Sequence, residues 1–251
     1  TTVPFAEEAA KIVPVVFSII FGTGTFYGLL AAPIARKLRL ASSNPQGIIF
    51  AGANYWTIKM GVALQEAGYR ILIIDANYSA TKNARMAGVP AVTVNAISDF
   101  VIEEIDLSGI GRMLAVTPND QVNSLACIGF AHALGRSNVY QLQPIDAEHS
   151  GRKSSSLELS GRRLFGENIT SEQIKKFEVT ESEAKLKPIT DEFTQENFIE
   201  RNGEDVLPMF IIRKPGELTV ITSESLPAAD GATIVSFATI LGEVDLSDTP
   251  E

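Results

Sequence analysis

Residues 47–57 read GIIFAGANYWT, in which a short apolar run ends at a glycine and a helix-compatible stretch begins. This pattern is typical of a buried β-strand that turns into a helix. Four more β-rich runs follow, with helical patterns between them. The predicted strands are 47–51, 71–74, 91–94, 113–116 and 139–142, and the predicted helices lie near 55–67, 78–87, 98–105 and 119–134. Strand–helix alternation at this spacing predicts an α/β fold with a doubly wound parallel sheet.

The turn after the first predicted strand is the expected ligand crevice, because backbone N–H groups and the helix dipole attract phosphate there. It reads Gly52-Ala53-Asn54-Tyr55-Trp56-Thr57, a GxN pattern in place of GxGxxG. Gly52 allows the tight turn, whereas Asn54 and Thr57 replace the other two glycines. Asparagine tolerates positive φ better than other non-glycine residues, so we expect the turn to persist with a poorer approach for phosphate.

Asp75 is predicted to end the second strand, 23 residues after Gly52, where a carboxylate can accept both hydroxyls of an adenosine ribose. Capping of the next helix is the other interpretation, and it is compatible with ligand contact. A carboxylate here disfavours a 2′-phosphate, so NADP is the less expected dinucleotide. Thr117 with Pro118 makes a sound helix cap and first turn, so capping and ligand contact both stay open there. The candidate nucleotide-binding residues are Gly52, Ala53, Asn54, Tyr55, Trp56, Asp75, Ala76, Asn95, Ala96, Thr117 and Asn119.

Residues 12–35 contain no charged side chain, and a helix over these 24 residues is about 36 Å long at 1.5 Å per residue. That length spans a bilayer. Arg36, Lys37 and Arg39 follow, and the basic excess on this side predicts that residues 40–251 are cytoplasmic. The run is too long and its leader too acidic for a signal peptide, whereas a buried helix of a soluble protein is the alternative. Because no initiating Met precedes the run, we expect the last helix of a longer membrane protein.

Two motifs stand in positions that do not suit their usual chemistry. Gly22-Thr23-Gly24 with Gly28 imitates a phosphate loop, but it lies inside the apolar run, where small residues favour close helix packing. Tyr78 and Lys82 imitate the YxxxK pair of short-chain dehydrogenases, but they begin three residues after Asp75, remote from any nicotinamide ring. We expect Tyr78 and Lys82 to be exposed in the first turn of the second predicted helix. No catalytic residue is predicted.

Composition argues against several other classes of protein. The formal charge of −9, without a basic stripe, argues against nucleic-acid binding. Residues 1–145 carry a net charge of +1 and residues 146–251 a net charge of −10, which predicts two compositional zones. Cys127 is the only cysteine, and the two histidines lack metal-site spacing, so neither a disulfide framework nor a metal site is predicted. The acidic residues between positions 181 and 196 lack the glycine loop of a calcium site.

The chain beyond residue 145 is predicted to form a small α+β domain. Residues 146–169 are rich in Ser, Gly and Arg, which is typical of a linker. Thr170 with Gln173 predicts a capped helix near 171–177. The strands predicted after it cover 207–213, 218–222 and 232–240. The predicted organisation is a transmembrane helix with its flanks at 1–40, a nucleotide-binding domain at 45–145 and the α+β domain at 150–245.

A set of short motifs carries a resemblance to one family. They are GAN at 52–54, LQEAG at 64–68, ID at 74–75, ARMAG at 84–88, LAVTPND at 114–120, Asn123 and VYQL at 139–142. This run resembles the TrkA-N (RCK/KTN) domain, and more narrowly the version fused behind the membrane part of NhaP-like sodium/proton antiporters of the CPA1 group. The apolar run, with Tyr27-Gly28-Leu29 and Ala32-Pro33-Ile34-Ala35, resembles the final transmembrane helix of those antiporters.

The resemblance implies a Rossmann-like domain that binds NAD(H) or an adenine nucleotide (AMP or ATP) and forms a homodimer. It also implies that the binding state passes to a transporter transmembrane domain upstream in the same chain. We therefore expect a nucleotide-sensing regulatory domain of a monovalent cation/proton antiporter at the inner (plasma) membrane, with cytoplasmic C-terminal domains and no enzymatic activity. The alternatives are a soluble NAD-dependent oxidoreductase and the gating subunit of a potassium channel or uptake system.

Overall fold

The computed structural model of the chain divides into two compact units, one ending at Pro45 and the other beginning at Gln46. It describes residues 4–37, 45–98, 101–145, 161–166, 169–179, 182–190, 197, 206–213, 216–225, 228 and 231–239.

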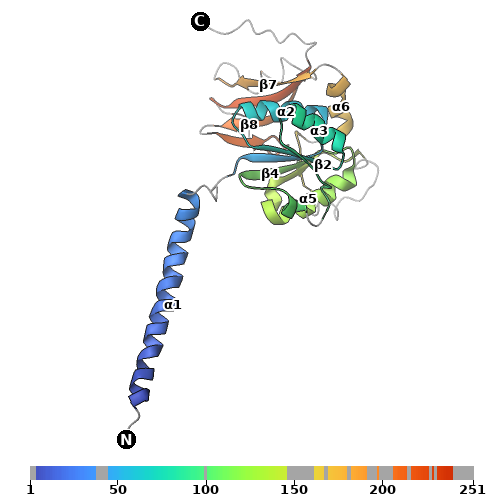
Figure 1. The fold of residues 1–251 in the computed structure, drawn as a ribbon. Helices are drawn as coiled ribbons and strands as arrows, with labels where there is room; N and C mark the ends of the chain where they lie inside the picture. The colour runs from blue at the N-terminus through green and yellow to red at the C-terminus, as the bar shows by residue number, and fades with distance from the viewer. Residues whose placement is uncertain are drawn as a thin grey trace. The chain divides into compact units, whose positions relative to one another are not determined.

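The first unit is the single helix α1 (Pro4–Lys37) (Figure 1). Its segment Ile12–Ala31 has a mean hydropathy of 1.8, and none of it is buried. Phe17 and Phe21, for example, are 72% and 71% exposed. By length and composition this helix is able to cross a membrane. The predicted N-terminal apolar helix is therefore confirmed.

The second unit is built on a parallel sheet in the order β3-β2-β1-β4-β5-β6. Its strands are β1 (Gly47–Ala51), β2 (Ile71–Asp75), β3 (Ala91–Thr93), β4 (Ile110–Ala115), β5 (Val139–Gln141) and β6 (Arg162–Arg163). The helices between them are α2 (Tyr55–Glu66), α3 (Tyr78–Met86), α4 (Val101–Glu104), α5 (Asp120–Leu134) and the 3-10 helix η1 (Arg136–Asn138). The strand order reverses between β1 and β4, as in a doubly wound Rossmann-like sheet. The predicted fold class is confirmed.

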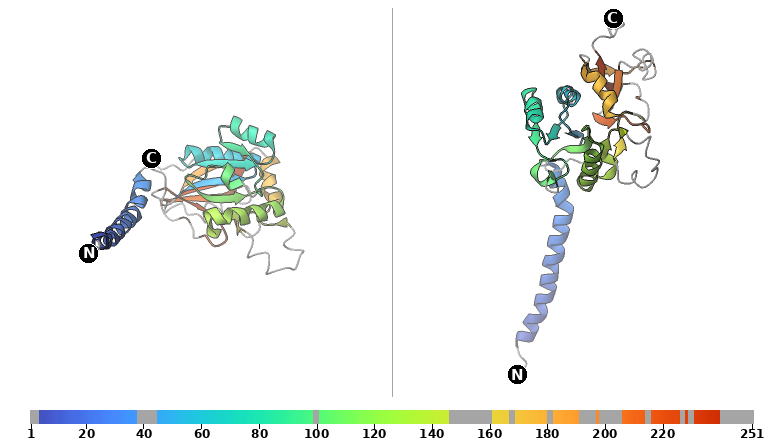
Figure 2. Two further views of the ribbon diagram at one scale, coloured as in Figure 1. Left: turned by 60° about the horizontal axis from the view of Figure 1, so that its bottom comes forward. Right: turned by 90° about the vertical axis from the view of Figure 1, so that its right-hand side faces the viewer.

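Both faces of the parallel sheet are buried, which explains the continuous apolar runs of its strands. Ile48 and Phe50 of β1 point to the side covered by α2 and α3, and Ile49 and Ala51 point to the side covered by α4 and α5. Figure 1 and the right-hand view of Figure 2 show this division, with α2 and α3 on one side of the sheet and α5 on the other. The alternation follows from the two-residue period of a strand.

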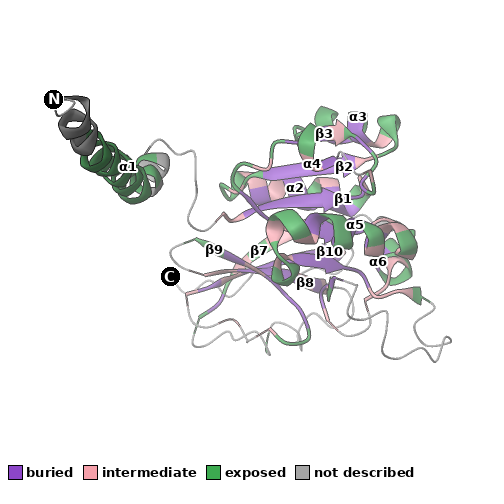
Figure 3. Ribbon diagram, turned by 90° about the horizontal axis from the view of Figure 1, so that it is seen from below, coloured by how far each residue is buried: buried purple, intermediate pink, exposed green. Residues whose placement is uncertain are grey.

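A second sheet is antiparallel and has the order β7-β10-β8-β9. Its strands are β7 (Ser182–Pro188), β8 (Val206–Arg213), β9 (Glu217–Val220) and β10 (Thr233–Thr239), and α6 (Ser171–Val179) comes before them. Phe210 of β8 and Phe237 of β10 belong to the same buried cluster as Phe50 and Trp56. The antiparallel sheet therefore shares one core with α2, on the same side of the parallel sheet (Figure 2). In Figure 3 the strands β1, β2 and β10 are buried, whereas α1 is exposed.

Four aromatic rings connect the two sheets through this core. Phe50, Trp56, Phe165 and Phe210 follow one another with ring centroids 6.0, 5.9 and 6.0 Å apart, each pair edge-to-face. Phe165 adopts a φ of +61°, which is unfavourable for a bulky side chain. Its ring is only 5% exposed, so packing against Trp56 and Phe210 compensates for the strained backbone.

The linker predicted over 146–169 is wrong where residues 162–163 form β6. Arg162 and Arg163 pair with Tyr140 and Gln141 of β5, which adds a sixth strand to the parallel sheet. Strand β7 was not expected, because its sequence SEAKLKP alternates polar residues with few apolar ones. It lies at an edge of the antiparallel sheet, where one face meets solvent.

The C-terminal elements otherwise follow the sequence. The capping box before α6 is confirmed, since Thr170 N donates to Gln173 Oε1 at 2.9 Å and Gln173 N donates to Thr170 Oγ1 at 3.4 Å. Strands β8 and β9 lie where strands were predicted over 207–213 and 218–222, and they pair antiparallel. The turn residues Lys214 and Pro215 lie outside the described residues, as do the acidic residues Glu181, Asp191, Glu192 and Glu196.

Cys127 is buried on the inner face of α5, and its thiol donates to Tyr140 O at 3.4 Å. Burial raises the pKa of this thiol to about 12. The thiolate is the reactive form, and a raised pKa lowers its fraction at neutral pH. We expect the folded chain to resist alkylation by iodoacetamide at about pH 8 and to react at once when unfolded. Mass spectrometry would count the adducts, and labelling of the folded chain at the unfolded rate would contradict the buried position.

Candidate functional site

The chain turns from β1 into α2 at Gly52, whose φ is +128°. A Cβ at this position would lie 3.1 Å from backbone atoms of Val116 and Thr117, directly after β4. Both the positive φ and the close approach require glycine. The turn therefore stands against the end of β4, where the strand order reverses, which is the usual place of a ligand crevice in such sheets.

Asp75 ends β2 and faces the same turn. Its Oδ2 accepts the Ala53 N–H at 2.8 Å, and its Oδ1 accepts the Asn77 N–H at 2.8 Å. A carboxylate oxygen has two lone pairs, so each oxygen keeps one for a further donor. The structure thus brings the Gly52 turn and the Asp75 carboxylate together, as expected from the ends of neighbouring parallel strands.

The side chains of Asn54 and Thr57 hold the turn in place through hydrogen bonds within the protein. Asn54 Nδ2 donates to Val116 O at 2.7 Å, which joins the turn to the segment after β4. Thr57 is fully buried, and its hydroxyl lies 3.0 Å from Gly52 O and accepts the Asn54 N–H at 2.8 Å. Asn54 has a φ of −91°, so the positive φ suggested for this residue is wrong. The left-handed conformation falls at Gly52, and threonine in place of the third glycine locks the turn.

Tyr55 and Trp56, two candidate contacts, point away from the crevice toward the antiparallel sheet. Trp56 is 1% exposed and belongs to the shared core, and it also lines the small cavity described below. Tyr55 OH donates to Ser182 O at 3.3 Å, and its ring stacks edge-to-face on Phe237 with centroids 6.5 Å apart. Tyr55 therefore connects the residue after Asn54 to the antiparallel sheet.

The segment after β4 is held by a side-chain network. Asn119 caps α5, with Oδ1 accepting the N–H groups of Gln121 at 3.0 Å and Val122 at 3.2 Å. The prediction of Thr117 as the cap with Pro118 in the first turn is therefore wrong. Thr117 instead donates through both its N–H and its hydroxyl to Asn123 Oδ1, at 2.9 and 2.7 Å. These internal bonds explain the position of Thr117 without a ligand.

The remaining candidates lie around the ends of β2 and β3. Ala76 is exposed beside Asp75, and Ala96 is 7% exposed. Asn95 is exposed, and its Oδ1 accepts the Ile97 N–H at 3.2 Å. Tyr78 is 65% exposed and Lys82 is also exposed, so the expected surface position of this pair on α3 is confirmed.

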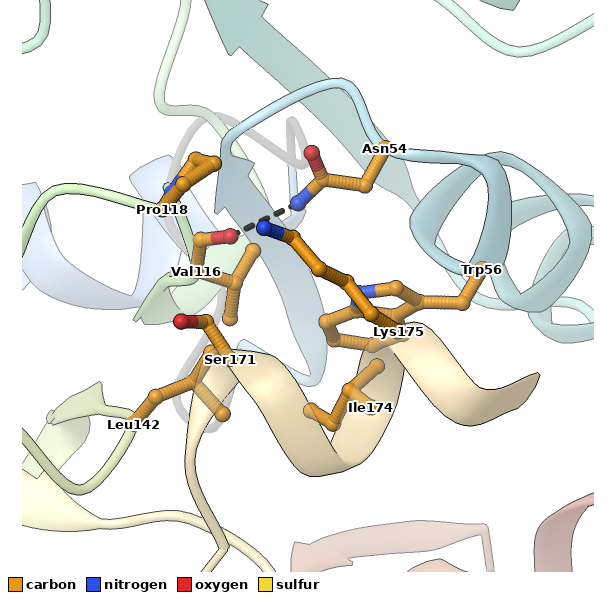
Figure 4. Close-up of a pocket in the computed structure, with 8 residues that line it drawn as sticks. All are labelled: Asn54, Trp56, Val116, Pro118, Leu142, Ser171, Ile174 and Lys175. Atoms are coloured by element: carbon orange, nitrogen blue, oxygen red, sulfur yellow. Dashed lines mark hydrogen bonds between the residues drawn. The ribbon is translucent and has the colours of Figure 1, made fainter. Parts of the chain in front are cut away.

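Helix α6 lines two cavities, and the first of them lies beside the turn. The first holds about 20 Å³, which is room for about one water molecule. It is lined by Asn54, Trp56, Val116, Pro118, Leu142, Ser171, Ile174 and Lys175 (Figure 4). The second holds about 460 Å³ and is lined by Gln143, Pro144, Ile145, Thr170, Glu172, Gln173 and Lys176. Helix α6 contributes to both cavities, and no local sequence pattern indicates that this helix lies beside the turn.

Residues 48–141 match the family model of the TrkA-N domain. This TrkA-N segment contains Gly52, Asp75 and every other candidate residue, whereas α6 and the antiparallel sheet lie outside it. The family match covers the part of the chain in which the glycine turn and the carboxylate meet.

Comparison with solved structures finds similar chains at low sequence identity. The NAD(P)-binding domain of an exopolyphosphatase-related protein from Archaeoglobus fulgidus is 15% identical, with a TM-score of 0.40 over 53% of this chain and 95% of that one. The TrkA-N domain of the inner membrane protein ybaL from Escherichia coli is 13% identical, with a TM-score of 0.40 over 55% and 96%.

The GsuK channel bound to NAD is 14% identical, with a TM-score of 0.41, and the match covers 96% of this chain. The chain spans 47% of the length of that channel chain. A comparison with curated proteins gives no match.

Proposed function

We propose that the chain is a nucleotide-sensing regulatory region of a membrane transport protein. The observation that most directly supports this function is the 2.8 Å hydrogen bond from Ala53 N to Asp75 Oδ2. This bond holds a carboxylate beside the glycine turn of the TrkA-N segment. A ligand with a ribose and a phosphate fits this pair of groups, because the carboxylate accepts hydroxyls and the start of α2 favours an anion.

Asp75 would hold the ribose of an adenosine through the free lone pair on each carboxylate oxygen. The backbone around Gly52, at the start of α2, would face the phosphates. A 2′-phosphate would be repelled by Asp75, so the proposed ligands are NAD(H), AMP or ATP rather than NADP. The Asn54 side chain donates a hydrogen bond to Val116 O on the side of the turn where the phosphates would lie. Binding therefore requires this side chain to move.

The apolar helix α1 supports a membrane position for the same chain. Its length suits a bilayer, and the basic residues that follow it favour a cytoplasmic position for the TrkA-N segment. We propose that the transport protein is a monovalent cation/proton antiporter at the inner (plasma) membrane, that its transmembrane domain lies upstream in the same chain, and that the chain acts as a homodimer.

The proposed role is regulatory and involves no catalysis. A ligand shifts an equilibrium between two arrangements only by the difference in its affinity for them. The turn is connected to the antiparallel sheet through Tyr55, so a change at Asn54 has a short route to the C-terminal elements. This contact is the structural basis for coupling in the proposal.

Calorimetric titration of the full chain in detergent micelles with NADH, NAD, AMP and ATP would test the function. We expect one or more of these to bind and Asp75→Asn to weaken that binding about tenfold, since charged acceptors make the stronger hydrogen bonds. Asp106→Asn is the matched control, because Asp106 pairs with Arg70 at 2.7 Å before β4, away from the crevice. Absence of binding by all four ligands would remove the proposed function.

A further inference from the structure

Lys175 of α6 lines the small cavity together with Asn54 of the turn, although it stands far outside the TrkA-N segment in sequence. Figure 4 shows its amino group directed toward the Asn54 end of the cavity. The neighbouring residue Lys176 lines the other, larger cavity instead. Two consecutive lysines on one helix therefore serve two different cavities.

The side chains that line the small cavity carry a net positive charge. None of its lining residues is an aspartate or glutamate, and Lys175 is the charged one among them. Within the described part of the chain, Lys175 makes no ion pair. An ammonium group beside polar hydrogen-bond donors such as Asn54 Nδ2 and the Ser171 hydroxyl suits an anion.

The position of the cavity agrees with the direction of a nucleotide bound at Asp75. Asp75 stands on the β2 side of the turn, where its carboxylate meets Ala53. The cavity lies on the β4 side, where Asn54 meets Val116. A ribose at Asp75 and a phosphate chain that crosses the start of α2 would therefore end at Lys175.

We propose that Lys175 contacts the phosphate groups of the nucleotide, with Ser171 beside it, and so completes the site from outside the TrkA-N segment. This inference rests on the proposed function and adds a binding residue to it. The cavity of about 20 Å³ is smaller than a phosphate group, so the Asn54–Val116 hydrogen bond must open and α6 must shift when the ligand enters.

Helix α6 contacts elements of both sheets, so a shift of this helix would affect both of them. Thr170 forms a parallel bridge with Gln143, two residues after the end of β5, and Gln143 N donates to Ile169 O at 2.9 Å. Phe177, near the other end of the helix, packs on Phe237 of β10 with ring centroids 6.0 Å apart. Lys175 therefore connects the phosphate end of the ligand to both sheets, and a phosphorylated ligand moves elements that adenosine alone leaves in place.

The test is a calorimetric titration of the full chain in detergent with ATP, NAD and adenosine, for the wild type, Lys175→Gln, Lys175→Arg and Lys176→Gln. We expect Lys175→Gln to weaken the phosphorylated ligands about tenfold and to leave adenosine unchanged, as for one lost charge-assisted hydrogen bond. Lys175→Arg should retain most of the affinity, because its charge is kept. Lys176→Gln, which removes the same charge one residue on, should behave as the wild type.

Unchanged ATP and NAD affinity in Lys175→Gln would overturn the inference while leaving the nucleotide site standing. A loss confined to Lys176→Gln would also overturn it and would place the phosphates in the larger cavity. Equal losses for adenosine and ATP in Lys175→Gln would show a general effect on folding rather than a phosphate contact. Failure of the wild type to bind any ligand would remove the proposed function, and the inference with it.

Discussion

The double variant Ile20→Lys/Phe21→Lys is expected to release the chain from the membrane. Both residues lie near the middle of the apolar segment of α1, where they are 64% and 71% exposed. A lysine at the centre of a membrane-spanning helix costs about 2.5–3.5 kcal/mol, so two cost about 6 kcal/mol. Membrane flotation of cells that express the chain would measure the effect, with the wild type in the membrane fraction and the variant outside it.

The matched control is a single lysine at the end of the same segment, Ile12→Lys, because a long basic side chain near a helix end reaches the headgroup region. This variant should remain in the membrane fraction. If the double variant floats with the membranes as the wild type does, or if the wild type itself is found in the soluble fraction, α1 does not span the bilayer.

Trp56→Ala is expected to lower the free energy of unfolding of the second unit by about 3–5 kcal/mol, the range for large aromatic truncations in a core. Trp56 lies between Phe50 of the parallel sheet and Phe165, so its removal opens a cavity in the row of rings that joins the two sheets. Since Trp56 is the only tryptophan, fluorescence is lost with it, and urea unfolding followed by far-UV circular dichroism is the suitable measurement.

Tyr78→Ala provides the control for this variant, since Tyr78 is an aromatic residue of α3 that is 65% exposed. Its unfolding free energy should change little. Equal unfolding free energies for Trp56→Ala and the wild type would contradict a shared core. Two separated unfolding transitions in Trp56→Ala alone would show that the row of rings makes the sheets unfold together.

The sequence was most informative where structure depends on local pattern. The strands β1 and β2 are buried on both faces, so they appear as uninterrupted apolar runs. Gly68, Gly88 and Gly135 follow the ends of α2, α3 and α5, and their positive φ values of 90°, 87° and 84° explain why glycine marks these helix ends in the sequence. The meeting of Gly52 and Asp75 was also predictable, because Gly52 follows β1 and Asp75 ends β2, and these neighbouring parallel strands end at the same side of the sheet.

What the sequence did not show depends on contacts between distant segments. Strand β6 consists of two arginines in a stretch with linker composition, and only pairing with β5 makes it a strand. The covering of the parallel sheet by the antiparallel one follows from packing that no local pattern encodes. Lys175 lies 100 residues after Asp75, so its approach to the turn is a property of the folded chain alone.

The hydrogen bonds of Gln46 and Gly47 affect how a force along the chain would reach this unit. Its Oε1 accepts the Leu218 N–H of β9 at 2.8 Å, while the next residue, Gly47, donates to Gly109 O at 3.0 Å. These two hydrogen bonds join the start of this unit to β9 of the antiparallel sheet and to the residue before β4 of the parallel sheet. Tension transmitted along the chain through Pro45 would act on the residues that make these two bonds, and therefore on both sheets.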